Sequence, residues 1–389
     1  MTRHLLLFAP LLLATPALAQ QGDVEDPTAI VVTGTPLSET AGRLAACLAR
    51  KCPPKEDIAA SLAHAENQFI AGDYTGSRAT LRAAHIRNQP YGKQYPVEVS
   101  DLDRAYGRLT NLNGYPDRGR LLQINALETL KAGVGSDDAR AMIQRITTGD
   151  EFVMMGRVDA GDEVYRKVEK QAREAGQIQV AGFAMLRQAT VFSAIATTTY
   201  AFRVNAREKI RRLEATTEPE LAEYRAAAKI LRARLAAKWN DEGDFAKVMT
   251  ELGGMRTQRP VLLYSPPVNF DQAEAVAGRS INDDPQWMDV RYRIDADGKV
   301  ADVEVLRRSG NVGGVWPNAV LKALAKRRYA PLALDDGETG KTRIERFSFV
   351  FDVKTPTGSR VAGRSSVGRV TSLDLTLDPP ADPAANKGR

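Results

Sequence analysis

From about residue 39 to residue 255, stretches rich in Ala, Leu, Arg and Glu alternate with short turns marked by Gly and Asp. Stretches of this length and composition predict helices, and the Gly and Asp positions predict the turns between them. We therefore expect residues 39–255 to form an all-α domain.

A weak internal repeat runs through this helical region. Its turns carry evenly spaced glycines, and a small residue follows shortly after each of them. These residues are Gly72, Gly114 and Gly156 at the turns, and Ser77, Gly119 and Gly161 after them. In a helix-turn-helix repeat, glycine permits the tight turn and the small side chain lets the paired helices approach closely. The pattern predicts stacked helix pairs that bury each other's apolar faces.

The segment Ala71-Gly72-Asp73-Tyr74, followed by Ser77, resembles the inter-helix turn of the tetratricopeptide repeat. The period here is longer than in that family, and the proline that usually closes each unit is missing. The resemblance implies a tetratricopeptide-like α-solenoid that serves as a protein-interaction scaffold. An irregular helical bundle is the alternative that the sequence leaves open.

The pattern changes near Arg259-Pro260, where helix-breaking prolines appear and β-branched residues begin to alternate with polar ones. The alternation before the turn at Asp297-Gly298 predicts one strand, and the valines after it predict a second strand. The alternating residues are Val290, Tyr292 and Ile294 in the first strand, and Val300, Val303 and Val305 in the second.

A helix and a third strand complete this carboxy-terminal region. A helix is expected from Trp316 onward because apolar residues recur at helical spacing, and Pro331 ends it. The helix face comprises Trp316, Ala319, Val320, Ala323 and Leu324, and the third strand carries Phe347, Phe349, Phe351 and Val353. The β-β-α-β order predicts a small α+β domain, an antiparallel sheet covered by one helix, over residues 258–354.

This order, together with Asp297-Gly298, Ser309-Gly310 and the run Arg328-Tyr329-Ala330-Pro331, resembles the TonB carboxy-terminal domain. The resemblance implies a module that binds a short extended peptide of an outer-membrane receptor by strand addition. In that family the exposed last strand accepts the peptide. The implied peptide-binding edge comprises Arg346, Phe347, Ser348, Phe349, Val350, Phe351, Asp352 and Val353. The sequence leaves open whether this edge is free or occupied by the chain's own leader or tail. The family's energy transducers also have an uncleaved membrane helix and a long proline-rich segment, and the lack of both here puts energy transduction in doubt.

A leader, residues 20–38, precedes the helical region and is rich in Gly, Asp, Pro and Thr. Within it, Ile30, Val31, Val32, Thr33 and Gly34 resemble the TonB-box-like start of TonB-dependent receptors. The resemblance implies that this segment docks on a TonB-type sheet edge, in another protein, in a second copy or in this chain. An ordinary short strand or linker is the alternative.

Residues 1–19 have the organisation of a secretory signal peptide. Arg3 and His4 give a short polar start, residues 5–13 an apolar core, and Ala17-Leu18-Ala19 a cleavage site. The apolar run is shorter than the roughly 20 residues that span a bilayer. We expect cleavage after Ala19, release into the periplasm and no transmembrane helix in the mature chain. An uncleaved anchor is the alternative.

Cys47 and Cys52 are the two cysteines of the chain. Two nearby thiols usually pair in an oxidising compartment, and Pro53-Pro54 ends the preceding helix, so we expect a disulfide between them. A redox-active pair is the alternative, although the spacing differs from CxxC. The formal net charge of +6 is mildly basic and specifies no partner. No nucleic-acid-binding pattern is present, so no such partner is expected.

The sequence offers few candidates for catalysis, cofactors or metals. The mature chain holds His64 and His85, both in Ala-rich helical surroundings where a packing role is the simpler interpretation. Metalloprotease, nucleophile-elbow, phosphate-loop and dinucleotide motifs are missing. We expect neither enzymatic activity nor a cofactor or metal site. Residues 355–389, rich in Gly, Ser, Pro and Asp, predict a mostly disordered tail in which 370–377 could add a strand.

Taken together, these patterns predict a multidomain periplasmic protein, with a helical-repeat array followed by a TonB-like domain. The expected function is binding of a protein or peptide by strand addition, linked to TonB-dependent envelope transport. The expected partners are the TonB system, an outer-membrane receptor or a second copy joined through the sheet edge. The alternative is a structural or stress-related cell-envelope protein whose TonB-like domain has no role in energy transduction.

Overall fold

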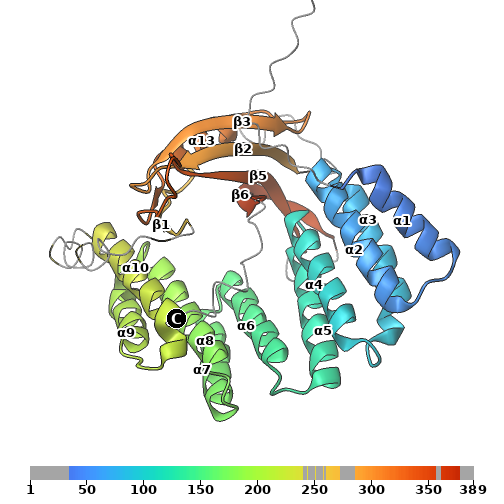
Figure 1. The fold of residues 1–389 in the computed structure, drawn as a ribbon, viewed down its shortest axis with the longest axis horizontal. Helices are drawn as coiled ribbons and strands as arrows, with labels where there is room; N and C mark the ends of the chain where they lie inside the picture. Colours follow the sequence, from blue (N-terminus) through green and yellow to red (C-terminus); the bar gives the residue numbers. More distant parts are fainter. Residues whose placement is uncertain are drawn as a thin grey trace, which may run out of the picture. The chain divides into compact units, whose positions relative to one another are not determined.

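The computed structural model describes residues 35–239, 260–271, 285–355 and 361–376, together with residues 243, 250 and 257. In these residues a helical region is followed by a small antiparallel sheet domain, as the sequence predicted, and both belong to one unit that starts at Pro36 (Figure 1). The predicted signal peptide, the TonB-box-like segment from Ile30 to Gly34, and residues 377–389 lie outside the described residues.

The helices of the array follow one another in chain order, and each packs mainly against the next (Figure 1). They are α1 (Leu37–Ala49), α2 (Pro54–Ala71), α3 (Tyr74–Asn88), α4 (Pro96–Leu112), α5 (Pro116–Val134), α6 (Ala139–Met154), α7 (Val158–Glu174), α8 (Ile178–Ala196), α9 (Arg203–Glu214) and α10 (Ala222–Lys238). Short 3₁₀ turns at Gln89–Tyr91, Tyr200–Phe202 and Pro219–Leu221 lie between some of them.

The evenly spaced glycines stand at the turns that the sequence assigned to them. Gly72, Gly114 and Gly156 follow α2, α4 and α6, with φ angles of 92°, 86° and 78° that favour glycine. The small residues after these turns allow close helix approach. At Ser77 of α3 the hydroxyl donates a hydrogen bond to the Ala65 carbonyl of α2 at 2.6 Å. The repeat units are therefore the pairs α2–α3, α4–α5 and α6–α7.

Helix α8 is the one described helix that is long and apolar enough to cross a membrane, judged by length and composition alone. In this structure 56% of its apolar stretch is buried. Met185 and Phe192 of α8 pack with Ile210 of α9 and Leu231 of α10, so the apolarity of α8 supplies the core of the array.

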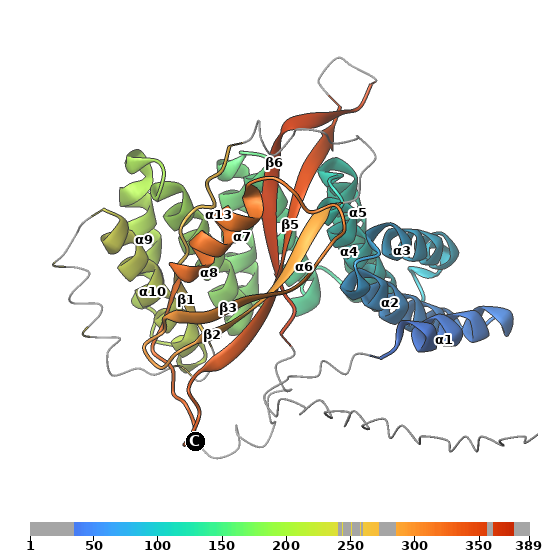
Figure 2. The ribbon, with the colours of Figure 1, turned by 90° about the horizontal axis from the view of Figure 1, so that it is seen from above.

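The sheet domain contains β2 (Gln286–Ile294), β3 (Val300–Arg308), α13 (Trp316–Ala325), β5 (Lys341–Lys354) and β6 (Gly363–Asp374). The sheet is antiparallel with the strand order β3-β2-β5-β6. The short strands β1 (Leu262–Tyr264) and β4 (Arg328–Tyr329) pair beside it. Helix α13 lies on one face of the sheet (Figure 2), where Trp316 stacks on Phe349 at a ring-centroid distance of 5.9 Å.

The predicted order β-β-α-β appears as β2, β3, α13 and β5, and an additional strand follows it. Residues 363–374 form β6, so the prediction of disorder is wrong for residues 363–369, whereas the strand that the sequence allowed at 370–377 is present as far as Asp374. The physical reason is that an edge strand binds through its main chain and therefore needs few apolar side chains. The Gly- and Ser-rich composition of β6 therefore resembles that of a disordered tail, although β6 is paired with β5.

Candidate protein-binding site

The predicted peptide-binding edge lies on β5, and β5 is not an edge strand. It pairs with β2 from Phe349 to Lys341 and with β6 from Lys354 to Glu345. The outer strands of the described sheet are β3 and β6. Residues 346–353 are therefore not an exposed last strand, because the chain's own tail supplies the next strand, β6.

The side chains of β5 point alternately to two different neighbours. Phe347, Phe349 and Phe351 pack into the core that α13 covers. Arg346 and Ser348 lie on the opposite face, against the helical array, and both are buried. Both faces of β5 are therefore covered over residues 346–351.

Arg346 joins the sheet to the array through a fully buried side chain. Its guanidinium donates to the Asp289 carboxylate at 2.7 and 2.9 Å, and also to the carbonyl oxygens of Phe69 and Ile70 at the end of α2. The last carbonyls of a helix lack intrahelical donors and carry partial negative charge, which a cation complements. The guanidinium also lies 4.0 Å from the centre of a Trp287 ring.

Burial alone would lower the pKa of Arg346, but the hydrogen bonds from its guanidinium to Asp289 raise the pKa above its ordinary value. The guanidinium is therefore charged at any physiological pH. A buried ion pair that loses one partner leaves an uncompensated charge, which is strongly destabilising. We interpret Arg346 as a structural residue that fixes β5 and β2 to the end of α2.

The turn between α2 and α3 fits closely onto the sheet around Arg346. Gly72 faces Trp287 so closely that a Cβ atom would overlap the Trp287 ring. The Tyr74 hydroxyl lies 2.9 Å from the Ser348 hydroxyl, and Arg307 of β3 donates to the Ile70 carbonyl at 2.8 Å. The glycine that begins the repeat pattern thus also sets the distance between array and sheet.

The next turn of the array, at Gly114, contacts β5 further along the strand. The Val353 amide of β5 donates to the Gly114 carbonyl at 2.6 Å, beside the irregularity in the β5–β6 pairing. Arg369 of β6 donates to the Asn111 carbonyl at 2.9 Å, and also to the Asp352 carboxylate at 2.9 Å. Two successive repeat turns therefore hold the sheet in place.

Strand β6 contributes few side chains to this assembly. Among the residues of β6 whose burial is described, only Gly368 is buried, and Val367 is 60% exposed. A Cβ atom at Gly368 would overlap the ring of Phe349, which is fully buried. Val370 packs against the sheet core, and Leu373 points to the array. Main-chain pairing with β5 is thus the main contact of β6.

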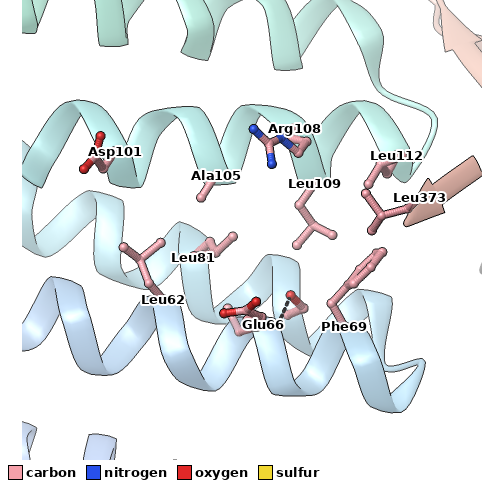
Figure 3. Close-up of a pocket in the computed structure, with 12 residues that line it drawn as sticks. Leu62, Glu66, Phe69, Leu81, Asp101, Ala105, Arg108, Leu109, Leu112 and Leu373 are labelled. Carbon is pink, nitrogen blue, oxygen red and sulfur yellow. Dashed lines mark hydrogen bonds between the residues drawn. The ribbon is translucent and has the colours of Figure 1, made fainter. Parts of the chain in front are cut away.

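Leu373 closes one end of a groove of about 400 Å³ between α2 and α4 (Figure 3). The groove is mainly apolar, and three charged residues stand along it. Its lining comprises Leu62, Ala65, Glu66, Phe69, Ser77, Leu81, Asp101, Ala105, Arg108, Leu109, Leu112 and Leu373. The end of β6 and this groove are therefore one continuous surface.

The opposite edge of the sheet, on β3, is less suited to strand addition. The β2–β3 pairing is irregular at two places, and Asp302 has a φ of 51°, which is uncommon for a residue other than glycine. Asp302 also forms an ion pair with Arg293 at 2.6 Å. Bulges and charges of this kind hinder a further strand from pairing at a sheet edge.

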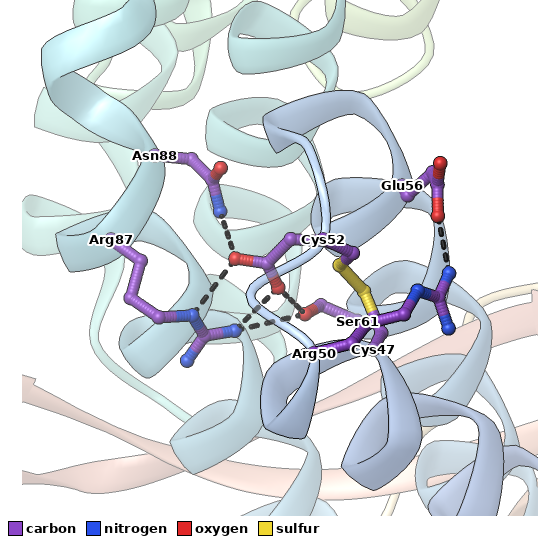
Figure 4. Close-up of a disulfide and its surroundings, with 8 residues drawn as sticks. Cys47, Arg50, Cys52, Glu56, Ser61, Arg87 and Asn88 are labelled. Atoms are coloured by element: carbon purple, nitrogen blue, oxygen red, sulfur yellow. Dashed lines mark hydrogen bonds and ion pairs between the residues drawn. A yellow bond between two sulfur atoms is a disulfide. The ribbon is translucent and has the colours of Figure 1, made fainter.

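The predicted disulfide between Cys47 and Cys52 is present and links the end of α1 to the loop that precedes α2 (Figure 4). Beside it, the buried carboxylate of Asp57 accepts hydrogen bonds from Arg87, Asn88 and Ser61. Burial acts to raise the pKa of Asp57, but these hydrogen bonds outweigh it and lower the pKa below its ordinary value.

The two histidines lie at helix contacts, apart from the groove and from β6. His85 Nδ1 is 2.6 Å from Asp103 of α4, and His64 Nδ1 is 3.1 Å from the Thr40 hydroxyl of α1. Over the residues that the structure describes, no group of three or more His, Cys, Asp or Glu side chains is arranged to hold a metal ion.

The described residues thus define a class of architecture, a helical array joined by buried contacts to a small antiparallel sheet with one covering helix. No protein-family model matches the chain, and no curated protein matches it. Among solved structures, the crystal structure of BtubC (BKLC) from P. vanneervenii matches with 12% sequence identity and a TM-score of 0.42. The match covers 60% of this chain and 96% of that chain. A likeness of this size supports no inference about function.

Proposed function

We propose that this protein is an exported, non-enzymatic interaction protein of the bacterial cell envelope. Its sheet domain binds an extended protein segment by strand addition beside β5, and its helical array serves as the scaffold. The observation that carries this proposal is the pairing of β6 with β5 from Lys354 to Glu345, although β6 buries few side chains. The edge of β5 therefore accepts a strand that is recognised mainly through its main chain.

The contacts of β5 on its other sides support the same proposal. Arg346, Ser348 and Val353 hold β5 against two turns of the array. A binding edge held on rigid elements loses little conformational entropy when a partner strand pairs with it. The array thus acts as a support for the edge, in addition to any surface of its own that contacts a partner.

The proposed link to TonB-dependent transport rests on the TonB resemblance of residues 258–354. The order β2, β3, α13, β5 supports that resemblance at the level of element order. The tetratricopeptide-like character of the array is a proposal of the same kind, supported by the glycine turns at Gly72, Gly114 and Gly156. Residence in the periplasm is supported by the Cys47–Cys52 disulfide, because disulfides persist in oxidising compartments.

One observation favours the second candidate, a structural cell-envelope protein without a peptide partner. The edge of β5 is already occupied by β6, and both faces of β5 are buried over residues 346–351. In that case β6 would complete the sheet permanently and the domain would serve only to brace the array.

A peptide titration separates the two candidates. A labelled peptide of residues 26–38 is added to a chain that begins at Pro36, and binding is followed by fluorescence anisotropy and backbone NMR shifts. Strand addition predicts saturable binding with shifts centred on β5. The control is the same peptide with Val31→Pro, which lacks one backbone donor and should lose binding. Failure of both peptides to bind at millimolar concentration would favour the structural candidate.

A further inference from the structure

We propose that β6 is an exchangeable occupant of the partner site, and that its sequence is the template for the partner. The partner would be an extended peptide with the pattern Gly-Arg-Val-x-x-Leu, as in Gly368, Arg369, Val370 and Leu373. This inference rests on the proposed function, because it names the partner of the same binding edge. It adds that the site spans the edge of β5 and the adjoining end of the α2–α4 groove.

The core of the sheet leaves room only for a glycine at the first position of the pattern. A Cβ atom at Gly368 would overlap the ring of Phe349 and approach that of Phe351. Phe349 cannot move away easily, because it is fully buried and packs on Trp316 and Phe270. A residue with a side chain at this position would therefore force either the partner strand or the core to shift.

Groups on the array-facing side of the sheet favour a basic residue at the second position of the pattern. Arg369 pairs with the Asp352 carboxylate of β5 and also donates to the backbone and side-chain oxygens of Asn111 at the end of α4. One guanidinium thus contacts both the sheet and the array. A peptide with an acidic residue at this position would bring two like charges together beside Asp352, which is unfavourable.

The two apolar positions of the pattern enter different surfaces. Val370 lies opposite Phe349 and packs against the sheet core. Leu373 lies opposite Arg346 and closes the groove near Phe69 and Leu112 (Figure 3). The other side chains near them tolerate exchange, since Ser372 and Val367 are exposed. The site therefore selects the residues of a partner strand at the four positions that correspond to Gly368, Arg369, Val370 and Leu373.

The way in which β6 is held makes exchange physically reasonable. Strands with few buried side chains open locally at a free energy well below that of global unfolding. Strand β6 follows β5 in the same chain after only a few residues, and such a covalent connection gives a segment a high effective concentration at its site. A partner in solution therefore competes against β6 and binds weakly until β6 is released.

The test uses the full mature chain and a labelled peptide of residues 363–376. The substitution Gly368→Val in the chain weakens its own β6 but leaves the edge of β5 unchanged. We expect the labelled peptide to bind the G368V chain at least tenfold more tightly than the unmodified chain, measured by anisotropy. The control V367S changes an exposed residue of β6 and should bind the peptide as weakly as the unmodified chain.

Two altered peptides test the pattern itself. A peptide carrying Gly368→Val should not bind the G368V chain, and a peptide carrying Arg369→Glu should bind it at least tenfold more weakly. If the G368V chain fails to unfold cooperatively, Arg369→Ala in the chain replaces it and should also tighten peptide binding. The inference is overturned if the peptide does not bind a folded G368V or R369A chain at millimolar concentration.

Other outcomes separate this inference from the proposed function. Binding of the 26–38 peptide with equal affinity to the unmodified and G368V chains would support strand addition and overturn the role of β6. Binding of the 363–376 peptide to the G368V chain without binding of the 26–38 peptide would support β6 exchange and remove the leader as a partner. A concentration-dependent dimer that G368V abolishes would overturn the peptide partner in favour of the β6 strand of a second copy.

Discussion

Strands β2 and β6 flank the same strand, β5, and differ in how they are held. Both pair antiparallel to β5 over most of its length. Strand β2 buries Trp287, Met288, Val290 and Tyr292, whereas Gly368 is the one buried position among the described side chains of β6. Because apolar burial contributes most of the stabilisation of a strand, β2 is held more firmly than β6 although both form similar backbone pairing with β5. From this difference we infer that β2 is a permanent neighbour of β5 and that β6 is the exchangeable one.

The helical array reinforces this difference. Asp289 of β2 belongs to the same buried cluster as Arg346 and the end of α2. Strand β6 reaches the array through Arg369 at the end of α4 and through Leu373 at the groove. The array therefore fixes the β2 side through a fully buried cation and contacts the β6 side through partly exposed groups.

The largest effect is expected from removing the buried cation on the β2 side. Arg346→Ala should lower the free energy of unfolding by about 2–4 kcal/mol, because Asp289 then keeps only its half-exposed partner Arg307 and the Phe69 carbonyl loses a charged donor. Urea denaturation followed by circular dichroism measures this. The control is Arg291→Ala, which breaks a half-exposed pair with Glu304 and should cost about 0–1 kcal/mol. Equal costs for the two variants would contradict the role of Arg346.

A pair of glycine substitutions measures the fit between the array and Trp287 of β2. Gly72→Ala and Gly156→Ala both place a side chain at a positive φ at the end of a repeat helix. The Cβ atom at Gly72 would overlap Trp287, whereas the Cβ atom at Gly156 meets open space. We expect G72A to cost about 1–3 kcal/mol more than G156A in urea denaturation. If G72A and G156A lower the free energy of unfolding equally, the α2–α3 turn is not closely packed against Trp287.

A smaller effect is expected on the β6 side. Arg369→Ala removes hydrogen bonds to Asp352 and Asn111, and should lower the opening free energy of β6 by about 1–2 kcal/mol. Hydrogen exchange of the amides between β6 and β5 measures this opening free energy. The amides between β2 and β5 should keep their protection. V367S serves as the control with no expected change. Loss of protection across the whole sheet in R369A would show that β6 and β2 unfold together.

The smallest effect is a pH dependence that originates in the array and not in the sheet. The pKa of Asp57 lies below its ordinary value of 3.8, so the folded state gains stability from the charged form. That stability is present above the unfolded pKa and is lost as the pH falls below about 4 through the folded pKa. The stability difference between the unmodified chain and Asp57→Asn should therefore shrink on acidification, measured as urea midpoints. A constant difference would contradict this.

Local rules were sufficient to predict several elements from the sequence. The turns at Gly72 and Gly114 follow from the conformational freedom of glycine, and the hairpin before Val300 follows from Asp297-Gly298. The apolar face of α13 follows from helical spacing, with Trp316 buried as expected. In each of these cases the signal lies within a few residues of the element that it predicts.

The role of β5 could not be predicted, because its determinants lie far apart in the chain. In an alternating strand, a polar residue such as Arg346 is normally assigned to solvent, yet its acceptors are helix-end carbonyls at Phe69 and Ile70. The first half of β6 was missed because the composition of residues 363–369 is typical of disorder. The groove at Leu373 forms where the end of β6 meets α2 and α4, so no local sequence pattern predicts it.

Native-state hydrogen exchange tests whether β6 opens alone while β2 stays paired with β5. The amides that join β6 to β5 and those that join β2 to β5 are followed in the unmodified chain at low urea concentrations. We expect the β6 amides to exchange through a local opening whose free energy is at least about 2 kcal/mol below that of global unfolding and depends little on urea. The β2 amides should exchange only through global unfolding. Equal protection and equal urea dependence for the two sets would contradict it, and β6 would then be a permanent strand of the sheet.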